Sequence, residues 1–260
     1  VRLSIEPAPS HWTQGSDVFG NVCDAFALYT PHESLCVVAS SRVVLEPGAR
    51  DDADAGSGAT LGWERVAQTC RYRAGAPFEP ASEFVFQSPF VPQLAALGEY
   101  AAPSLAPGRP LLSAATELMH RIHADFTYDG DATDISTPLA QVLKERRGVC
   151  QDFAHLMIGA LRARGLPARY VSGYLLTQPP PGRPRLLGAD ASHAWIAVWC
   201  PPLGWVDFDP TNAVLPGHAQ SHVTLALGRD YGDVMPLRGV IRGSGEHTLS
   251  VAVSVVPHDE

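Results

Sequence analysis

The stretch GVCQDFAHL, from Gly148 to Leu156, decides the fold of this chain. It places Cys150 where a helical apolar periodicity begins, and Gly165 and Pro167 end that helix shortly after Arg164. The apolar residues on one face are Phe153, Ala154, Met157, Ile158 and Leu161. Unpaired backbone N–H groups and the helix dipole stabilise negative charge at a helix N-terminus, so Cys150 has the setting of a reactive thiolate.

Two further helices are expected upstream of this segment. The first follows a cap at Ser113 and has apolar residues at i, i+4 and i+8: Leu118, Ile122 and Phe126. The second begins at Pro138, after Ser136 or Thr137 as the cap, and Gly148 lies just past its end.

Strand-like patterns follow the cysteine helix. The ranges expected to form strands are 168–176, 193–200 and 205–208. Residues 201–204, PPLG, join the last two as a hairpin, and residues 178–191 form a loop rich in Pro and Arg. The alternation in residues 249–256 predicts one more strand near the C-terminus.

The N-terminal part has the period of strands rather than helices. Residues 19–29 and 35–45 are expected to be strands, and the breaker-rich stretch 100–110 separates this part from the helical region. We therefore expect a β-rich domain over residues 1–102 and a second, catalytic domain over residues 103–260.

Composition limits the classes of function. The formal net charge is -8, which argues against nucleic acid or anionic lipid as a partner, and 45% hydrophobic residues suffice for a core. No run approaches 18 apolar residues and the first residues lack the apolar core of a signal peptide, so we expect no membrane partner and a cytoplasmic location.

The five cysteines are an odd set without a C-x-x-C pair, which is poor material for disulfides or structural zinc. At least one thiol is therefore free. Taken alone, Cys150 is better interpreted as a small buried residue than as a nucleophile. Two other residues of the chain favour a catalytic role for Cys150.

The two residues that would act with Cys150 are His193, at the start of a strand, and Asp209, just after the next strand. Neighbouring antiparallel strands can bring them side by side, so that the carboxylate fixes the imidazole tautomer while the other ring nitrogen faces the thiol. On spacing alone, Asp207 competes with Asp209.

A metal site built from Cys150, His155, His193 and Asp209 is the chemical alternative at these positions. No pair among them has the short spacing usual in zinc sites, so we expect no metal. A Gly-rich phosphate loop is absent from the sequence, and no cofactor is expected.

Three segments, GVCQDFAHL, SHAW and GWVDFDPTN, resemble the Cys, His and Asp motifs of the transglutaminase-like superfamily, in the same order. DVFGN at 17–21, ARYVSGYL at 168–175 and GRDYGDVMPLRG at 228–239 resemble its bacterial branch of candidate cysteine proteases. The resemblance covers nearly the whole chain. The acid that it implies is the one before Pro-Thr, Asp209.

The resemblance implies an α+β fold: a papain-like core, with the nucleophile helix packed on an antiparallel sheet that bears His and Asp, and a β-rich, sandwich-like N-terminal domain. It also implies an aromatic residue that holds the oxyanion, a role that matches Tyr128. Two other readings stay open: Tyr128 anchors its loop through the hydroxyl, and Gln151 supplies the oxyanion donor.

The expected function is thiol-dependent acyl transfer on a peptide or protein amide, with Cys150 as nucleophile, His193 as base and Asp209 as its orienting acid. Hydrolysis by a protease, amidase or deamidase is favoured because it needs no second substrate site. Two alternatives are a transglutaminase that joins glutamine to amines and a non-catalytic module that keeps the fold for binding.

Overall fold

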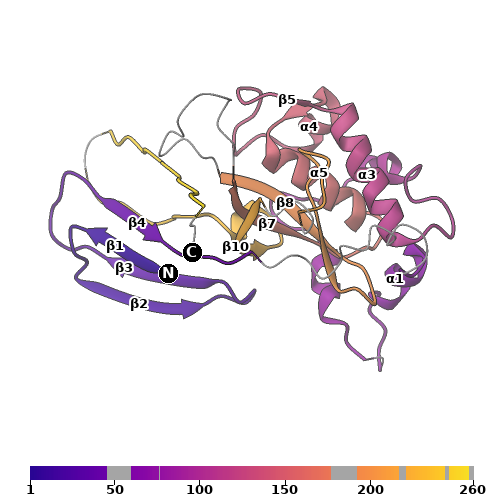
Figure 1. The fold of residues 1–260 in the computed structure, drawn as a ribbon, viewed down its shortest axis with the longest axis horizontal. Helices are drawn as coiled ribbons and strands as arrows, with labels where there is room; N and C mark the ends of the chain where they lie inside the picture. Colours follow the sequence, from indigo (N-terminus) through magenta and orange to yellow (C-terminus); the bar gives the residue numbers. More distant parts are fainter. Residues whose placement is uncertain (46–59, 76, 177–191, 217–220, 244–245, 258–260) are drawn as a thin grey trace. The chain divides into compact units, whose positions relative to one another are not determined.

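A computed structural model describes residues 1–45, 60–75, 77–176, 192–216, 221–243 and 246–257 (Figure 1). The chain divides into two compact units, Val1–Glu46 and Pro47–Glu260. The predicted loop at residues 178–191 lies outside the described residues. No helix in the described ranges is long and apolar enough to cross a membrane.

The first unit is built from two antiparallel pairs of strands. In one pair β1 (Arg2–Glu6) bonds to β4 (Cys36–Ser40), and in the other β2 (His11–Ser16) bonds to β3 (Val22–Ala27). This confirms the β-rich N-terminal region. Strands β1 and β2 were not predicted, because their residues are mostly exposed and carry little apolar alternation.

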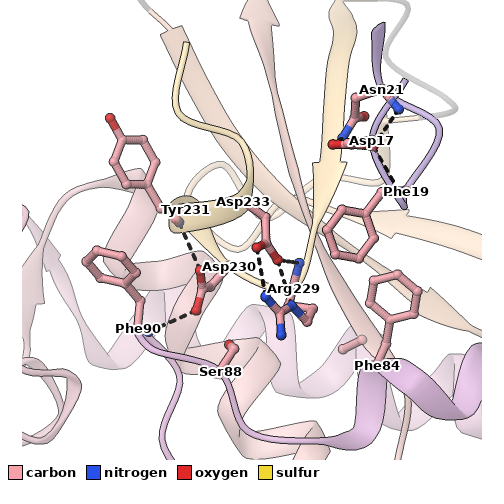
Figure 2. A network of polar contacts seen from close by, with 12 residues as sticks. Asp17, Phe19, Asn21, Phe84, Ser88, Phe90, Arg229, Asp230, Tyr231 and Asp233 are labelled. Atoms are coloured by element: carbon pink, nitrogen blue, oxygen red, sulfur yellow. Dashed lines mark hydrogen bonds and ion pairs between the residues drawn. The ribbon is translucent and has the colours of Figure 1, made fainter. Parts of the chain in front are cut away.

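The carboxylate of Asp17 stabilises the turn between β2 and β3. The first residues of the predicted strand 19–29 lie in this turn. Asp17 Oδ1 accepts hydrogen bonds from the backbone N–H of Phe19 at 2.8 Å and of Asn21 at 2.9 Å (Figure 2). Gly20 has a φ of 86°, a conformation that glycine adopts without strain. The turn therefore occupies residues 17–21, and the strand begins only at Val22.

The second unit contains one four-stranded antiparallel sheet in the order β10-β7-β8-β9. Its strands are β7 (Ala168–Leu175), β8 (Ser192–Trp199), β9 (Trp205–Phe208) and β10 (His222–Gly228). The first three and the β8–β9 hairpin were predicted, and the structure confirms them. β10 was not predicted, and the predicted strand at 249–256 is wrong: those residues form no strand within the described part.

Helix α5 (Cys150–Arg162) is the central helix of this unit and packs on β7 and β8. All of its residues from Asp152 to Arg162 are buried, and its apolar side chains join one core with those of the sheet. A helix that is apolar on every side must be covered on every side. The other helices of the unit supply that cover, and Figure 1 shows them gathered around α5.

The other helices of the unit come from both sides of α5 in the sequence. They are α1 (Trp63–Thr69), the 3-10 helix η1 (Pro80–Val85), α2 (Ala95–Ala101), α3 (Leu111–Asp125), α4 (Leu139–Glu145) and the 3-10 helix η2 (Tyr231–Asp233). Between α3 and α5, β5 (Thr127–Tyr128) pairs in parallel with β6 (Arg147–Gly148). Helices α2, α3 and α4 all contact α5 directly.

The helix termini differ in detail from the sequence prediction. Helix α3 begins after Pro110 rather than at Ser113, and α4 begins after Pro138, which is its N-cap rather than its first residue. Helix α4 ends at Arg146, which adopts a left-handed conformation with a φ of 58°. Gly148, expected as the residue that ends α4, lies instead in β6.

The predicted boundary between residues 102 and 103 does not coincide with the division between the compact units. Val66, Leu97 and Ala101 are fully buried in the same core as α5. Helices α1 and α2 therefore belong to the second unit, because α2 packs on α5 and α1 packs on α3 within the same core. The breaker-rich stretch around Pro103 and Pro107 is a turn inside this unit rather than a linker.

A buried arginine ties the end of α5 to three distant segments. Arg162 donates to the carbonyl oxygens of Phe84 at 2.9 Å, Ala168 at 2.9 Å and Arg229 at 2.7 Å, and to Ser88 Oγ at 3.1 Å. Burial lowers its pKa to about 10, although the nearby charge of Asp230 opposes that change.

The carboxylates near Arg162 organise the segment 228–233. Asp230 Oδ2 accepts from the N–H of Phe90 at 2.8 Å, and Asp233 bonds to Arg229 through both carboxylate oxygens (Figure 2). The segment GRDYGD at 228–233 therefore has a structural role: it connects the end of β10 to the chain around residues 84–90.

Arg162→Lys is expected to lower the free energy of unfolding by about 2–4 kcal/mol, because an ammonium group cannot reach several separated carbonyl oxygens and leaves them unsatisfied. Arg164→Lys is the matched control. Arg164 lies 5.9 Å from the Trp63 ring and its exchange is expected to cost less than about 1 kcal/mol. Urea denaturation followed by circular dichroism measures both, and equal losses would contradict the role given to Arg162.

Candidate active site

Cys150 is the first residue of α5 and is partly exposed. The local sequence fixes this position through Asp152, which is buried and whose Oδ2 accepts from the N–H of Val149 at 2.8 Å and from Thr133 Oγ1 at 2.6 Å. A Cβ on Gly148 would lie 2.5 Å from the same oxygen, so only glycine leaves room for this contact. Asp152 thus holds the start of the helix.

His193 is the second residue of β8 and its side chain is 9% exposed. Its Nε2 lies 2.7 Å from Asp209 Oδ2, and it also forms a hydrogen bond with Cys150. Because Nε2 faces the carboxylate, Nδ1 is the ring nitrogen left for the thiol. Burial alone lowers the pKa of His193, but the hydrogen bonds and charges of Asp209 and Cys150 outweigh it and raise that pKa to about 9.

Asp209 follows β9 directly and is fully buried. Its Oδ1 accepts from the backbone N–H groups of Thr211 at 2.9 Å and Asn212 at 3.2 Å, and its Oδ2 accepts from the Asn212 side chain at 2.7 Å. Burial alone raises the pKa of this carboxyl, but the hydrogen bonds with His193, His222 and Asn212 bring it well below its usual range. The carboxylate is therefore charged despite its burial.

The structure separates the two acids that the sequence left in competition. Asp207 accepts a hydrogen bond from Trp195 Nε1 at 3.1 Å, whereas Asp209 bonds to His193. Burial raises the pKa of Asp207, with Trp195 and Arg169 opposing it. Asp209 is therefore the acid that contacts the imidazole.

The two residues named as oxyanion candidates come from β5 and from the start of α5. Tyr128 pairs with Gly148 across β5 and β6, its ring lies 6.5 Å from that of Phe153, and it is 58% exposed. Burial and then the charge of Cys150 raise the pKa of Tyr128, which places its hydroxyl within electrostatic reach of the thiol. Gln151 lies half-buried in the first turn of α5.

Two residues near Asp209 were missed by the sequence analysis. His222 Nε2 lies 2.9 Å from Asp209 Oδ2, and Asn212 Nδ2 lies 3.3 Å from His193 Nε2 in addition to its bond with Asp209. The signal for His222 was a second Ser-His pair, Ser221-His222, ahead of a strand like Ser192-His193. Nothing in the sequence places β10 beside β7 in the sheet, so the pair gave no contact to predict.

Among the described residues, one group has the donors for a metal ion: His193, Asp209 and His222, whose ligand atoms lie within 4.8 Å of one another. The Nε2 atoms of His193 and His222 lie 2.7 and 2.9 Å from Asp209 Oδ2, which are hydrogen-bond distances. The side-chain amide of Asn212 donates a third hydrogen bond to the same oxygen. The arrangement therefore has the character of a hydrogen-bonded cluster.

His155, which the sequence offered as a further ligand, is placed elsewhere. Its Nε2 accepts from the N–H of Tyr231 at 3.2 Å, and its ring stacks on Phe90 with centroids 5.9 Å apart. Burial lowers its pKa to about 4, so it is neutral. The set of Cys150, His155, His193 and Asp209 is thus not brought together.

Two family models match this chain. The model of the transglutaminase-like superfamily matches residues 99–210, which include Cys150, His193 and Asp209. The model of the bacterial transglutaminase-like N-terminal region matches residues 1–44, which correspond to the first compact unit.

Relatives and one solved structure agree with these matches. An uncharacterized protein of Mycobacterium tuberculosis is 42% identical over 99% of this chain and 81% of its own length. The protein-glutamine gamma-glutamyltransferase of Pseudomonas aeruginosa is 38% identical over 33% of this chain and 13% of its own length. A candidate cysteine protease of Cytophaga hutchinsonii has the same fold, with a TM-score of 0.58 at 19% identity, over 90% of this chain and 71% of that one.

Asp209→Asn is expected to lower the pKa of His193 from about 9 by at least about one unit, because burial then acts without the opposing carboxylate charge. Asp207→Asn is the matched control, since Asp207 bonds to Trp195, and it should leave that pKa near its present value. NMR titration of the His193 ring in each variant measures both. Equal shifts in the two variants would contradict the assignment of Asp209.

The raised pKa also predicts how stability depends on pH. The charge of His193 contributes stability that is fully present below pH 6.5 and is lost as the pH rises through about 9. The pH dependence of unfolding between these values should therefore be weaker in Asp209→Asn than in the wild type. Urea denaturation at a series of pH values checks this.

Proposed function

Because the chain belongs to the transglutaminase-like superfamily, we propose that it is a thiol-dependent enzyme that hydrolyses amide bonds through Cys150, His193 and Asp209. The observation that carries this proposal is the 2.7 Å contact between His193 Nε2 and Asp209 Oδ2, combined with the hydrogen bond from His193 to Cys150. The charged, buried carboxylate therefore bonds to the imidazole, and the imidazole bonds to the thiol. That order is the one needed to activate a sulfur nucleophile.

In the proposed reaction the Cys150 thiolate attacks the carbonyl carbon of an amide, and the carbonyl oxygen becomes an oxyanion. Protonated His193 gives its Nδ1 proton to the leaving nitrogen, the C–N bond breaks, and a thioester forms with release of an amine or ammonia. A water molecule then attacks the thioester while His193 takes its proton. The acid product leaves and the thiolate–imidazolium pair is restored.

The oxyanion needs hydrogen-bond donors close to Cys150. The N-terminus of α5 supplies unpaired backbone N–H groups, and the pairing of Tyr128 with Gly148 brings a hydroxyl to the same region. Gln151 is the second side chain able to donate here. We propose Tyr128 as the side-chain donor, because its pKa responds to the charge of Cys150.

A second function, transglutamination, is favoured by one specific observation. The relative from Pseudomonas aeruginosa is named a protein-glutamine gamma-glutamyltransferase and shares 38% identity over 86 residues. Its reaction would differ from the proposed one only in the second step, where an amine rather than water attacks the thioester. The third possibility, a binding module without catalysis, is disfavoured by the charged Asp209 and the coupled His193 and Cys150.

The first test is alkylation of Cys150 by iodoacetamide between about pH 5 and 8, where an unperturbed thiol with a pKa near 8.5 reacts slowly. Mass spectrometry is expected to find Cys150 labelled first at low pH, with the exposed Cys23 and Cys36 as references in the same chain. His193→Ala should remove this advantage. If Cys150 reacts no faster than Cys23 and Cys36, the catalytic proposal fails.

The second test separates hydrolysis from transfer. N,N-dimethylcasein, whose lysines are blocked, is incubated with the protein with and without dansylcadaverine. Hydrolysis predicts ammonia or new amino termini without the amine, whereas transglutamination predicts a fluorescent protein product. Cys150→Ser, at the same concentration, should abolish every product.

Tyr128→Phe is expected to lower kcat about 10- to 100-fold, since it removes one oxyanion donor, while KM and the alkylation rate of Cys150 stay unchanged. Tyr72→Phe, which removes a hydroxyl from an 84% exposed residue beyond α1, is the matched control. The kinetics are measured on whichever substrate the casein assay identifies. An unchanged kcat in Tyr128→Phe would transfer the oxyanion role to Gln151.

A further inference from the structure

Asp209 holds two imidazoles on a single oxygen. Its Oδ2 lies 2.7 Å from His193 Nε2 and 2.9 Å from His222 Nε2, and the centroids of the two rings are 5.8 Å apart. His193 comes from β8 and His222 from β10, which are separated in the sheet by β7. A hydrolytic triad needs only one of them, so the second imidazole requires its own explanation.

The contacts of His222 fix which of its nitrogens carries a proton. Its Nδ1 lies 3.1 Å from Ser221 Oγ, a hydroxyl that can donate, and its Nε2 faces a carboxylate that can only accept. A ring with a proton on Nε2 and an acceptor at Nδ1 satisfies both contacts. Ser221, His222, Asp209, His193 and Cys150 then form one continuous chain of hydrogen bonds.

The rings are also held in place by packing. Trp195 lies edge-on to His222 with centroids 5.0 Å apart and is stacked on His193 at 6.1 Å. Its own Nε1 donates to Asp207, which fixes the indole. Gly173 gives it room, because a Cβ there would lie 2.4 Å from the Trp195 ring. The His222 ring therefore has a defined orientation toward Asp209.

We propose that His222 is a positioning residue for the Cys150–His193 pair. By donating to the oxygen of Asp209 that also accepts from His193, it divides the carboxylate charge between two imidazoles and limits how tightly Asp209 holds the His193 proton. A catalytic imidazolium must give up its proton to the leaving amine, and one held by an undivided carboxylate is a weaker acid. This inference rests on the proposed function, which it deepens.

The groups that can act on the His222 ring come from each element around it. They are His193 on β8, Asp207 on β9 and Asp209 after β9, and Cys150 on α5 acts through His193. Asp207 interacts with His222 electrostatically, and its own hydrogen bond is with Trp195. The effect of a substitution at His222 should therefore be measured on the pKa of His193, with Asp207 unchanged.

The experiment compares His222→Asn with His222→Gln. The side-chain amide nitrogen of Gln lies the same number of bonds from Cα as Nε2 of His, whereas that of Asn is one bond short, so only Gln can restore the donor to Asp209. Both variants are neutral and polar. NMR titration of the His193 ring, assigned with a His193→Gln sample, gives its pKa in each.

The expected result is that His222→Asn raises the pKa of His193 by about 0.5–1 unit, while His222→Gln leaves it within about 0.2 unit of the wild type. On an amide substrate, kcat should fall about 3- to 10-fold in His222→Asn with KM unchanged, and recover in His222→Gln. No shift in His222→Asn, a downward shift, or equal shifts in both variants overturns the proposal.

Ser221→Ala keeps the proposal testable if His222→Asn does not fold. Removing the hydroxyl that fixes the tautomer of His222 should raise the pKa of His193 in the same direction by a smaller amount, and an unchanged value overturns the proposal. The titration needs no substrate. If Cys150 proves inert to iodoacetamide but the pKa of His193 still depends on His222, the proposed function fails while the sharing of Asp209 stands.

Discussion

The burial of the Asp209 carboxylate is the constraint on which the site depends. An ionised carboxylate without partners is costly in a protein interior, and Asp209 is fully buried. Five N–H donors offset this cost, two to Oδ1 and three to Oδ2. They come from β8, from the turn after β9 and from β10, so satisfying one charge fixes the end of the sheet where His193 meets Cys150.

The nucleophile helix is constrained in a different way. Helix α5 is buried on nearly every side by the sheet and by three neighbouring helices, which leaves only its first two residues, Cys150 and Gln151, partly exposed. Asp152 and Gly148 hold the start of the helix, and Arg162 ties its end to distant carbonyl oxygens. The position of Cys150 is therefore set by packing at both ends of α5, and the sheet brings His193 to it.

The two Ser-His pairs show how similar local sequences acquire different roles. Ser192-His193 and Ser221-His222 both begin a strand, and both histidines bond to Asp209. Only His193 also bonds to Cys150. The difference follows from the strand order β10-β7-β8-β9, which places one histidine on the thiol side of the carboxylate and the other beyond it.

Local sequence was enough to determine the α+β class, helix α5 with Cys150 at its start, and the β8–β9 hairpin that carries His193 and Asp209, because periodicity and turn residues act over short distances. It could not choose between Asp207 and Asp209 without the family resemblance, and it missed His222. The tertiary structure alone decided which acid faces the imidazole, that α1 and α2 belong to the unit that carries Cys150, and that β10 brings a second histidine to Asp209. These contacts join residues far apart in the chain, and what selects them is the need to satisfy a buried charge and to cover a buried helix.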